Sequence, residues 1–376
     1  MSSFWCYAAC SFGLEAVVAR ELTALGLKEV KARDARVYFR ADERGVARAC
    51  LHLSAADRVY LVLGEFPAAS FDELFEGVKA LPWADWLAKD ARFPVQADAV
   101  RSRLKSVPDI QSVGKKAVVE ALSRAYGLRF FRENGAEVGL YISILADRAS
   151  VCVNPCGMGL NRRGYRVKNG PAPLRETLAA GMLHLSRWRD RPFYDLMCGS
   201  GTIAIEAARK ARCIAPGLSR EFAARAWGEA WSAVFAEERE AARAAVLPAA
   251  PGLVFARDID PKMVEMARFH ARRAGVEGDI SFAVADVRGF APGEERGTIF
   301  ANPPYAIRLG EREETRALYA AMGRALAPLS GWRQYYICAD DAFERLFGRR
   351  ADKTRKLYNG NIRCGFYQYF RDGGGT

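Results

Sequence analysis

The stretch DLMCGSGT, residues 195–202, decides the fold of this chain. Apolar residues before it predict a strand at 191–195, and IAIEAAR at 203–209 predicts a helix directly after the turn. A strand, a glycine-containing turn and a helix form the opening of a nucleotide-binding α/β half. Glycine lets the backbone pass close to a ligand, and the helix N-terminus presents free N–H groups. The stretch therefore predicts a ligand site at this turn.

The turn differs from two familiar phosphate-binding motifs. It does not read G-x-G-x-x-G, and no lysine follows Gly201, so neither the dinucleotide fingerprint nor the P-loop is present. An acidic residue, Asp195, precedes the turn. A carboxylate at that place disfavours a phosphate and favours a cationic or zwitterionic ligand. The alternative is an ordinary strand-to-helix turn without a ligand.

Further strands are predicted to end in polar residues. LVFARD ends at Asp258, SFAVAD ends at Asp286, and IFANPPY contains Asn302. A single aspartate after a strand is usually a turn former. Asp286 is a candidate ligand-binding residue only because it belongs to this series of strand ends. For the last stretch, IFANPPY, the alternative is an ordinary Pro-Pro turn after a strand.

The ordered set DLMCGSGT, ARDIDP, VADV and NPPY resembles the class I S-adenosylmethionine-dependent methyltransferases. Its NPPY form resembles the amino-methyltransferases, which modify exocyclic nitrogens of nucleobases. LNRRGYR at 160–166 and APLRETLAA at 172–180 are similar to the THUMP-domain RNA methyltransferases, a group that contains guanine-N2 methyltransferases of large-subunit rRNA and of tRNA. The resemblance covers nearly the whole chain. It implies a Rossmann-like class I catalytic domain with a seven-stranded sheet, preceded by ferredoxin-like and THUMP α/β units.

The resemblance also implies a pocket for S-adenosylmethionine. The carboxylate of Asp258 is suited to accept both ribose hydroxyl protons, Ile259 would lie against the adenine, and Asp286 would accept from the adenine amino group. Asp260 and Pro261 are suited to cap and begin the next helix. The predicted cofactor-binding residues are Asp195, Met197, Cys198, Gly199, Ser200, Gly201, Thr202, Asp258, Ile259, Asp286, Val287, Asn302, Pro173, Arg175 and Glu176.

Asn302, Pro303, Pro304 and Tyr305 are the predicted catalytic residues. The Asn302 side-chain oxygen and the Pro303 carbonyl can each accept one N–H of an exocyclic amine, which aims the nitrogen lone pair at the methyl group. The prolines fix the backbone that carries the two acceptors, and Tyr305 can stack on a flipped base. No strong base is present, so positioning supplies most of the rate. The family more often has glycine where this chain has Ala306.

The sequence divides into four predicted segments. They are a ferredoxin-like unit at 1–66, a THUMP unit at 67–158, a linker with a leading helix at 159–190, and the catalytic domain at 191–376 with a helical insert at about 212–252. The tryptophans of the insert are expected to pack it onto the catalytic domain. The first unit is expected to contain strands at 4–10, 36–40 and 59–66 and helices at 13–22 and 46–53. Phe4, Trp5 and Tyr7 could stack on bases, but most of these rings are expected to pack in the core.

A formal net charge of +12 and a pI near 9.3 favour a polyanionic partner. An R-x-R-x-K loop leads into a predicted helix that carries two lysines, a pattern suited to phosphates. The alternative is a solvated charged face. The predicted RNA-binding residues are Arg101, Arg103, Lys105, Lys115, Lys116, Arg162 and Arg163.

The composition excludes several other classes of protein. No apolar run reaches the roughly 18 residues that span a bilayer, and the N-terminus lacks the features of a signal peptide. The nine cysteines form no C-x-x-C pair, so neither a metal site nor a disulfide framework is indicated. Reduced thiols in the cytoplasm are the simplest interpretation.

The leading functional hypothesis is methyl transfer to the N2 amine of a guanosine, with 23S rRNA as the first substrate to consider. Three alternatives remain open. They are N6-adenine methylation of RNA or DNA, guanine-N2 methylation of tRNA, and a non-catalytic role as an RNA-binding assembly factor.

Overall fold

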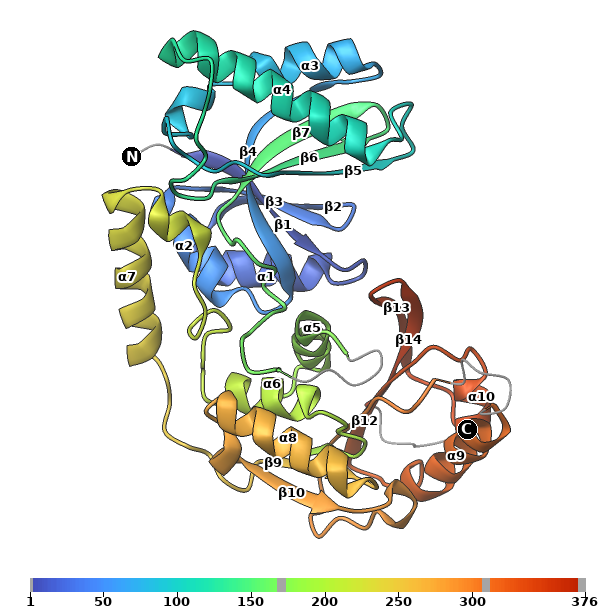
Figure 1. Ribbon diagram of the computed structural model, residues 1–376. Helices are drawn as coiled ribbons and strands as arrows, with labels where there is room; N and C mark the ends of the chain where they lie inside the picture. The colour runs from blue at the N-terminus through green and yellow to red at the C-terminus, as the bar shows by residue number, and fades with distance from the viewer. Residues whose placement is uncertain (1–2, 168–173, 306–311, 371–376) are drawn as a thin grey trace. The chain divides into compact units, whose positions relative to one another are not determined.

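The computed structural model describes residues 3–167, 174–305 and 312–370 (Figure 1). They form two compact units, each made of stretches that are not contiguous in the sequence. The first unit consists of Met1–Ala9, Ala19–Leu160 and Arg220–Ala241, and the second of Cys10–Val18, Asn161–Ser219 and Ala242–Thr376. No helix among the described residues is long and apolar enough to cross a membrane.

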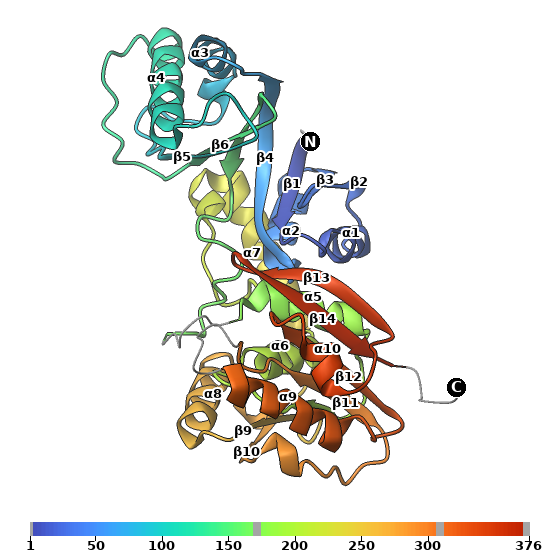
Figure 2. The ribbon, with the colours of Figure 1, turned by 90° about the vertical axis from the view of Figure 1, so that its right-hand side faces the viewer.

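The first unit is built on one seven-stranded sheet with the order β2-β3-β1-β4-β7-β6-β5. Its strands are β1 (Phe4–Cys10), β2 (Lys28–Arg33), β3 (Arg36–Ala41), β4 (Ala56–Pro67), β5 (Val95–Val100), β6 (Gly139–Leu145) and β7 (Arg148–Asn154). Its helices are α1 (Glu15–Ala24), whose first residues belong to the second unit, α2 (Glu43–His52), α3 (Phe71–Lys79) and α4 (Val107–Tyr126). The two predicted N-terminal units therefore share a single sheet, because the long strand β4 runs through both (Figure 2).

Strand β2 was not predicted from the sequence. Its residues, KEVKAR, are almost all exposed and show no apolar alternation. It lies at the edge of the sheet, where only β3 pairs with it. An edge strand without a buried face carries no hydrophobic signal, which is why the sequence pattern gave no sign of it.

The predicted insert is helical, but the expectation that it packs onto the catalytic domain is wrong for residues 220–241. These residues belong to the first unit, together with most of α7 (Glu229–Ala244). The Trp227 indole N–H donates to the Glu137 carbonyl at 2.9 Å, and Trp231 stacks on Phe4. Indole rings need apolar partners and a hydrogen-bond acceptor, and the N-terminal unit supplies them.

The second unit confirms the predicted seven-stranded sheet, in the order β10-β9-β8-β11-β12-β14-β13. The strands are β8 (Phe193–Asp195), β9 (Val254–Asp258), β10 (Ile280–Val284), β11 (Gly297–Ala301), β12 (Trp332–Cys338), β13 (Lys353–Asn359) and β14 (Ile362–Tyr369). The first five in that order are parallel, and β14 and β13 add an antiparallel hairpin. The helices are α5 (Glu176–Ser186), α6 (Thr202–Ala211), α8 (Pro261–Arg273), α9 (Arg312–Leu326) and α10 (Phe343–Phe347).

Strand β8 lies between β9 and β11, where the strand order reverses direction. Ligands of open α/β sheets bind outside the carboxyl ends of the strands at such a switch point. The turn after β8 has glycines in left-handed conformations, with φ of +50° at Gly199 and +86° at Gly201. A Cβ added to Gly201 would lie 2.9 Å from the Cβ of Ala267 in α8. The turn therefore depends on glycine at residue 201 for its conformation and for the close packing of α6 on α8.

We predict that Gly201→Ala destabilises the protein more than Gly199→Ala. The first change combines left-handed strain with overpacking, about 2–4 kcal/mol, whereas the second incurs only the strain, about 1–2 kcal/mol. A Cβ at Gly199 meets nothing within 4 Å. Urea unfolding of the two variants and the wild type measures the difference. Equal losses would contradict the close α6–α8 packing.

Candidate active site

The strand ends of the second unit bring most of the predicted site residues to one edge of the sheet. Asp195 ends β8 and Asp258 ends β9, while Asp286 and Asn302 follow β10 and β11 closely. These strands are parallel, so their carboxyl ends lie side by side. A cavity of about 250 Å³ opens there. Its lining consists of Leu196, Met197, Asp258, Ile259, Ala285, Asp286, Val287, Arg288 and Leu318.

The Asp258 carboxylate connects two loops at the cavity. One oxygen accepts from the Gly199 N–H at 2.8 Å, and the other accepts from the Asp260 N–H at 3.1 Å. The Asp260 side chain accepts from the Lys262 N–H at 2.8 Å and caps α8, as predicted. Ile259, which separates the two acids, is 61% exposed. A large apolar side chain held open beside a carboxylate is suited to a ligand with a flat ring and a polar group.

The Asp286 carboxylate is held by its own loop. It accepts from the Arg288 backbone N–H at 2.8 Å and from the Arg288 guanidinium. The guanidinium and the backbone N–H hold the pKa of Asp286 below its ordinary value. Asp286 is therefore ionised at neutral pH and remains an acceptor at the cavity wall.

Asp195 is fully buried beneath the turn. Its carboxylate oxygens make no hydrogen bond of normal geometry to any residue that the structure describes. Burial raises the pKa of Asp195 to about 8, and repulsion by Asp258 adds to the increase. The backbone N–H groups of Ala204 and Met197 face the carboxylate and oppose the shift. A buried acid that lacks a hydrogen bond of normal geometry suits a cationic group bound nearby.

The rest of the turn is fixed from several directions. The Cys198 N–H donates to the Arg257 carbonyl at 2.9 Å, and a ring nitrogen of buried His270 lies 3.0 Å from the Ser200 carbonyl oxygen. Thr202 begins α6. His270 was not predicted as a site residue, because a lone histidine in a helix carries no motif.

The NPPY segment follows β11, and side chains in it form hydrogen bonds within the protein. The Tyr305 hydroxyl donates to the Asn302 side-chain oxygen at 2.8 Å, and the Tyr319 hydroxyl donates to the Pro304 carbonyl at 2.7 Å. The Cys364 thiol lies 3.7 Å from the Tyr305 hydroxyl, which burial helps to keep protonated by raising its pKa. Tyr305 thus contacts Asn302 in this structure, whereas the prediction has it stacking on a base. The amide oxygen of Asn302 keeps a second lone pair for another donor. Ala306 lies outside the described residues.

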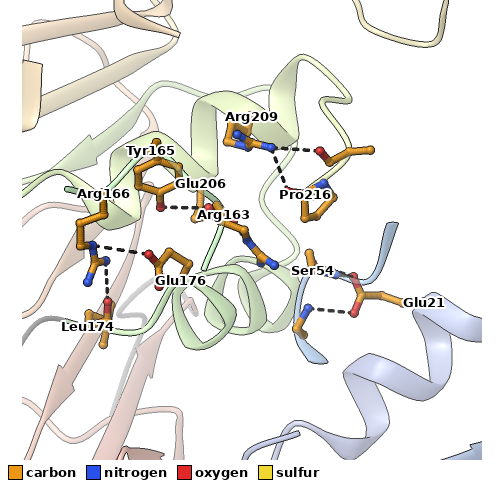
Figure 3. Close-up of polar contacts among 12 residues, drawn as sticks. Glu21, Ser54, Arg163, Tyr165, Arg166, Leu174, Glu176, Glu206, Arg209 and Pro216 are labelled. Atoms are coloured by element: carbon orange, nitrogen blue, oxygen red, sulfur yellow. Dashed lines mark hydrogen bonds and ion pairs between the residues drawn. The ribbon is translucent and has the colours of Figure 1, made fainter. Parts of the chain in front are cut away.

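A buried polar network supports α6 (Figure 3). Arg163 lies 3.5 Å from Glu206, which also accepts from the Tyr165 hydroxyl at 3.0 Å. Arg166 donates to the Thr202 hydroxyl at 2.5 Å and pairs with Glu176 at 3.5 Å.

Two predicted roles do not fit this network. Arg163 is only 1% exposed, so the prediction that it binds RNA is wrong: its charge neutralises a buried carboxylate. Glu176 is buried against Arg166, and burial raises its pKa. It does not line the cavity described above.

The remaining predicted residues divide by exposure. Arg175 is exposed at the start of α5, with its N–H 3.4 Å from the Asn359 side-chain oxygen, and Pro173 lies outside the described residues. Lys115 donates to Glu133 at 2.6 Å and to the Phe93 carbonyl at 3.0 Å, so it serves the THUMP unit internally. The cations predicted to bind RNA that lie exposed are Arg101, Arg103, Lys105, Lys116 and Arg162.

We predict that Arg163→Met destabilises the protein by about 3 kcal/mol, because buried Glu206 would lose the guanidinium that it pairs with. The neighbouring change Arg162→Met is the matched control, and it is expected to cost less than about 1 kcal/mol at an exposed position. Urea unfolding of both variants measures the contrast. Similar losses would contradict the structural role of Arg163.

We also predict that Asp195→Asn stabilises the protein near pH 7. The folded-state pKa of about 8 lies above the ordinary value of 3.8, so folding takes up a proton between these two pH values. The wild type therefore loses stability as pH rises through this window, and the neutral amide does not. The melting temperature of the variant should exceed that of the wild type at pH 7, with a smaller gain at pH 5. A gain that does not change with pH would contradict the raised pKa.

Comparison with protein-family models assigns the parts of the chain. Residues 163–368 match the RMKL-like methyltransferase domain. Residues 6–60 match the RlmL ferredoxin-like domain, and residues 68–154 match the THUMP domain.

Two curated relatives are similar over nearly all of this chain. A putative RNA methyltransferase from Bacillus subtilis, YpsC, is 41% identical, and the alignment covers 98% of this chain and 97% of that protein. The ribosomal RNA large subunit methyltransferase K/L of Syntrophotalea carbinolica is 33% identical. That alignment covers 95% of this chain and 52% of the longer relative.

Two solved structures have the same architecture. SMU.472, a putative methyltransferase crystallised with SAH, is 39% identical with a TM-score of 0.92, and the match covers 98% of each chain. A predicted N6-adenine-specific DNA methylase from Listeria monocytogenes is 42% identical with a TM-score of 0.91, covering 98% of this chain and 97% of that one. The fold, the order of domains and these similarities together place the chain in the family of RMKL-like methyltransferases with ferredoxin-like and THUMP domains.

Proposed function

We propose that this protein transfers a methyl group from S-adenosylmethionine to the exocyclic N2 amine of a guanosine in large-subunit rRNA, in the cytoplasm. The observation that carries the proposal is the position of Asn302-Pro303-Pro304-Tyr305, at the end of β11 and next to the glycine turn after β8. The names of the relatives support an RNA substrate, since one is a putative RNA methyltransferase and another is a methyltransferase of large-subunit ribosomal RNA.

The residues at the strand ends fit the proposed cofactor. Ile259 offers an exposed apolar surface for the adenine, and Asp258 and Asp286 offer carboxylates for the ribose and for the adenine amino group. The buried Asp195 carboxylate, whose oxygens make no hydrogen bond of normal geometry to the described residues, suits the positive charges of the methionine part. The SAH found in the SMU.472 structure supports the same cofactor class. When bound, S-adenosylmethionine supplies an electrophilic methyl group.

The NPPY segment supplies the acceptors that the reaction needs. The lone pair of an exocyclic amine is delocalised into the base, so the nitrogen must be held with its hydrogens engaged. The Asn302 oxygen and the Pro303 carbonyl accept those hydrogens, and the Tyr319 hydroxyl on the Pro304 carbonyl keeps the backbone in place. The Tyr305 hydroxyl orients the Asn302 amide in the free protein. Tyr305 has to turn from this position before its ring can stack on a base.

N6-adenine methylation is the second candidate. The same two acceptors can hold an adenine N6 amine, and the Listeria structure carries that predicted activity in its name. The two reactions differ in the product nucleoside, so product analysis separates them.

We predict that Asn302→Ala lowers methyl transfer to rRNA by about 100-fold or more, because one of the positioned acceptors is removed. Its affinity for S-adenosylmethionine should fall by less than tenfold. The matched control is Asn361→Ala, at an exposed position in the β13–β14 turn, and it should retain wild-type activity. The assay follows tritiated methyl transfer to purified rRNA, with mass spectrometry of the product nucleosides.

N2-methylguanosine as the product supports the proposal, and N6-methyladenosine would replace it with the second candidate. Full activity of Asn302→Ala would remove the NPPY segment from the mechanism. Asp258→Ala should weaken cofactor binding at least tenfold in the same preparations, as measured by calorimetry.

A further inference from the structure

The sheet of the first unit has an open face that the site described above does not use. On β3, Val37, Phe39 and Ala41 are buried, whereas Arg36, Tyr38 and Arg40 alternate with them and are only half-buried. In the antiparallel pairing, Trp5 of β1 lies opposite Arg40, and Tyr7 lies opposite Tyr38. Directly opposed residues point to the same face of a sheet. Trp5 and Tyr38 therefore share one face with a row of arginines.

This face is hollow because the sheet curls. The Arg36 guanidinium donates to the Ser143 hydroxyl at 2.5 Å, although β3 and β6 are separated in the sheet by β1, β4 and β7. A hollow of about 620 Å³ lies on this face, with Trp5, Lys31, Arg33 and Tyr38 among its lining residues. Its volume lies within the roughly 300–1,000 Å³ of ordinary ligand sites. A smaller hollow beside it shares Arg33, Tyr38 and Glu65 and adds Arg148.

The aromatic residues on this face of the sheet differ in exposure. The Tyr60 ring is tilted against Tyr7 and stacked on Tyr141, with ring centroids 5.1 and 4.7 Å apart. Tyr7 is only 1% exposed beneath the Arg36 guanidinium and Tyr60 is 5% exposed, and neither ring lines the two hollows. Trp5 is 38% exposed instead, with the Arg40 guanidinium 5.0 Å from its ring centre. An exposed ring beside cationic side chains is suited to stacking on a base.

The charges around the hollow are suited to phosphates. The two hollows are lined by the cations Lys31, Arg33 and Arg148 and by the acids Asp34 and Glu65. Arg148 directly follows Asp147, whose carboxylate accepts from Ser102 and from the Arg103 N–H. The exposed basic loop 101–105 thus connects to the hollow through the β6–β7 turn. Aromatic platforms beside a track of cations bind single-stranded nucleic acid.

The edge of the sheet argues against a peptide strand as the occupant. The free edge strand β2 carries Lys28, Lys31 and Arg33, and its pairing with β3 is irregular between Lys28 and Lys31. Glu29 has a φ of +54°, which interrupts an extended edge. Charges and irregularities of this kind prevent strand addition.

We propose that the hollow lined by Trp5, Tyr38 and Lys31 binds an unpaired segment of the RNA substrate, with a base stacked on Trp5 and phosphates on Lys31 and Arg33. The proposal rests on the proposed function, since it assumes an RNA substrate. It assigns a binding task to the ferredoxin-like part of the chain, remote in sequence from the NPPY segment. Duplex RNA cannot expose a base to such a platform without melting.

The test measures binding of a fluorescein-labelled ten-nucleotide oligouridylate to the full-length protein by anisotropy, without S-adenosylmethionine. We expect Trp5→Ala to weaken binding about tenfold, as removal of one stacked base does. Lys31→Glu should weaken binding and lower the slope of its salt dependence by about 0.7 for each phosphate that the variant no longer binds. The matched controls are Phe71→Ala, at a ring with 37% exposure on α3, and Arg124→Glu, at the exposed end of α4. Both controls should bind like the wild type.

A 4-thiouridine crosslink should map to the peptides of Trp5 or Tyr38. Wild-type affinity in both Trp5→Ala and Lys31→Glu would overturn the proposal, and so would crosslinks confined to other surfaces. If a polyglutamate peptide binds in the same hollow and RNA does not crosslink there, the occupant is an acidic peptide. This result would also overturn the proposal. Asn361→Ala, in the β13–β14 turn, should bind the oligonucleotide like the wild type. If methyl transfer fails but oligonucleotide binding still depends on Trp5, only the proposed function is rejected.

Discussion

The hydrogen bond from the Gly199 N–H to the Asp258 carboxylate, 2.8 Å long, ties the turn after β8 to the end of β9. It is possible because the two strands are parallel neighbours, and because Gly199 and Gly201 have left-handed backbone conformations. The same turn lies beside β11, which delivers Asn302 to the adjacent position. One topological feature, the reversal of strand order at β8, thus brings together the cavity and the segment that we propose acts on the substrate.

The turn also carries a stability penalty. Burial of Asp195 raises its pKa to about 8, so the folded protein without a ligand holds this acid mostly protonated near neutral pH. A cationic ligand would favour the ionised form and release a proton on binding. The network of Arg163, Glu206 and Tyr165 below α6 is different, since its buried charges compensate one another. Asp195 is suited to a ligand, whereas the buried network holds α6, the helix that follows the turn.

Sequence reasoning succeeded where local patterns coincide with the fold. Strand ends marked by acids, a glycine turn and a capped helix at Asp260 predicted the second unit and its family, because each signal lies within a few residues. It failed where long-range packing decides. Charge alone could not distinguish buried Arg163 from exposed Arg162, and the fully polar strand β2 showed no alternation. Nor could it show that residues 220–241 pack with the N-terminal unit, or that Trp5 stays exposed on a curled sheet. The roles of the individual site residues remain predictions.

The central claim is that the strand ends of the second unit direct a methyl group onto a guanine amine of large-subunit rRNA. Mass spectrometry of nucleosides from rRNA and tRNA tests it most directly, in a strain that lacks the gene and is complemented with wild type or with Asn302→Ala. The account predicts that N2-methylguanosine disappears from 23S rRNA, returns with the wild-type gene and stays absent with the variant. An unchanged set of modified nucleosides in cells that normally express the gene would contradict it.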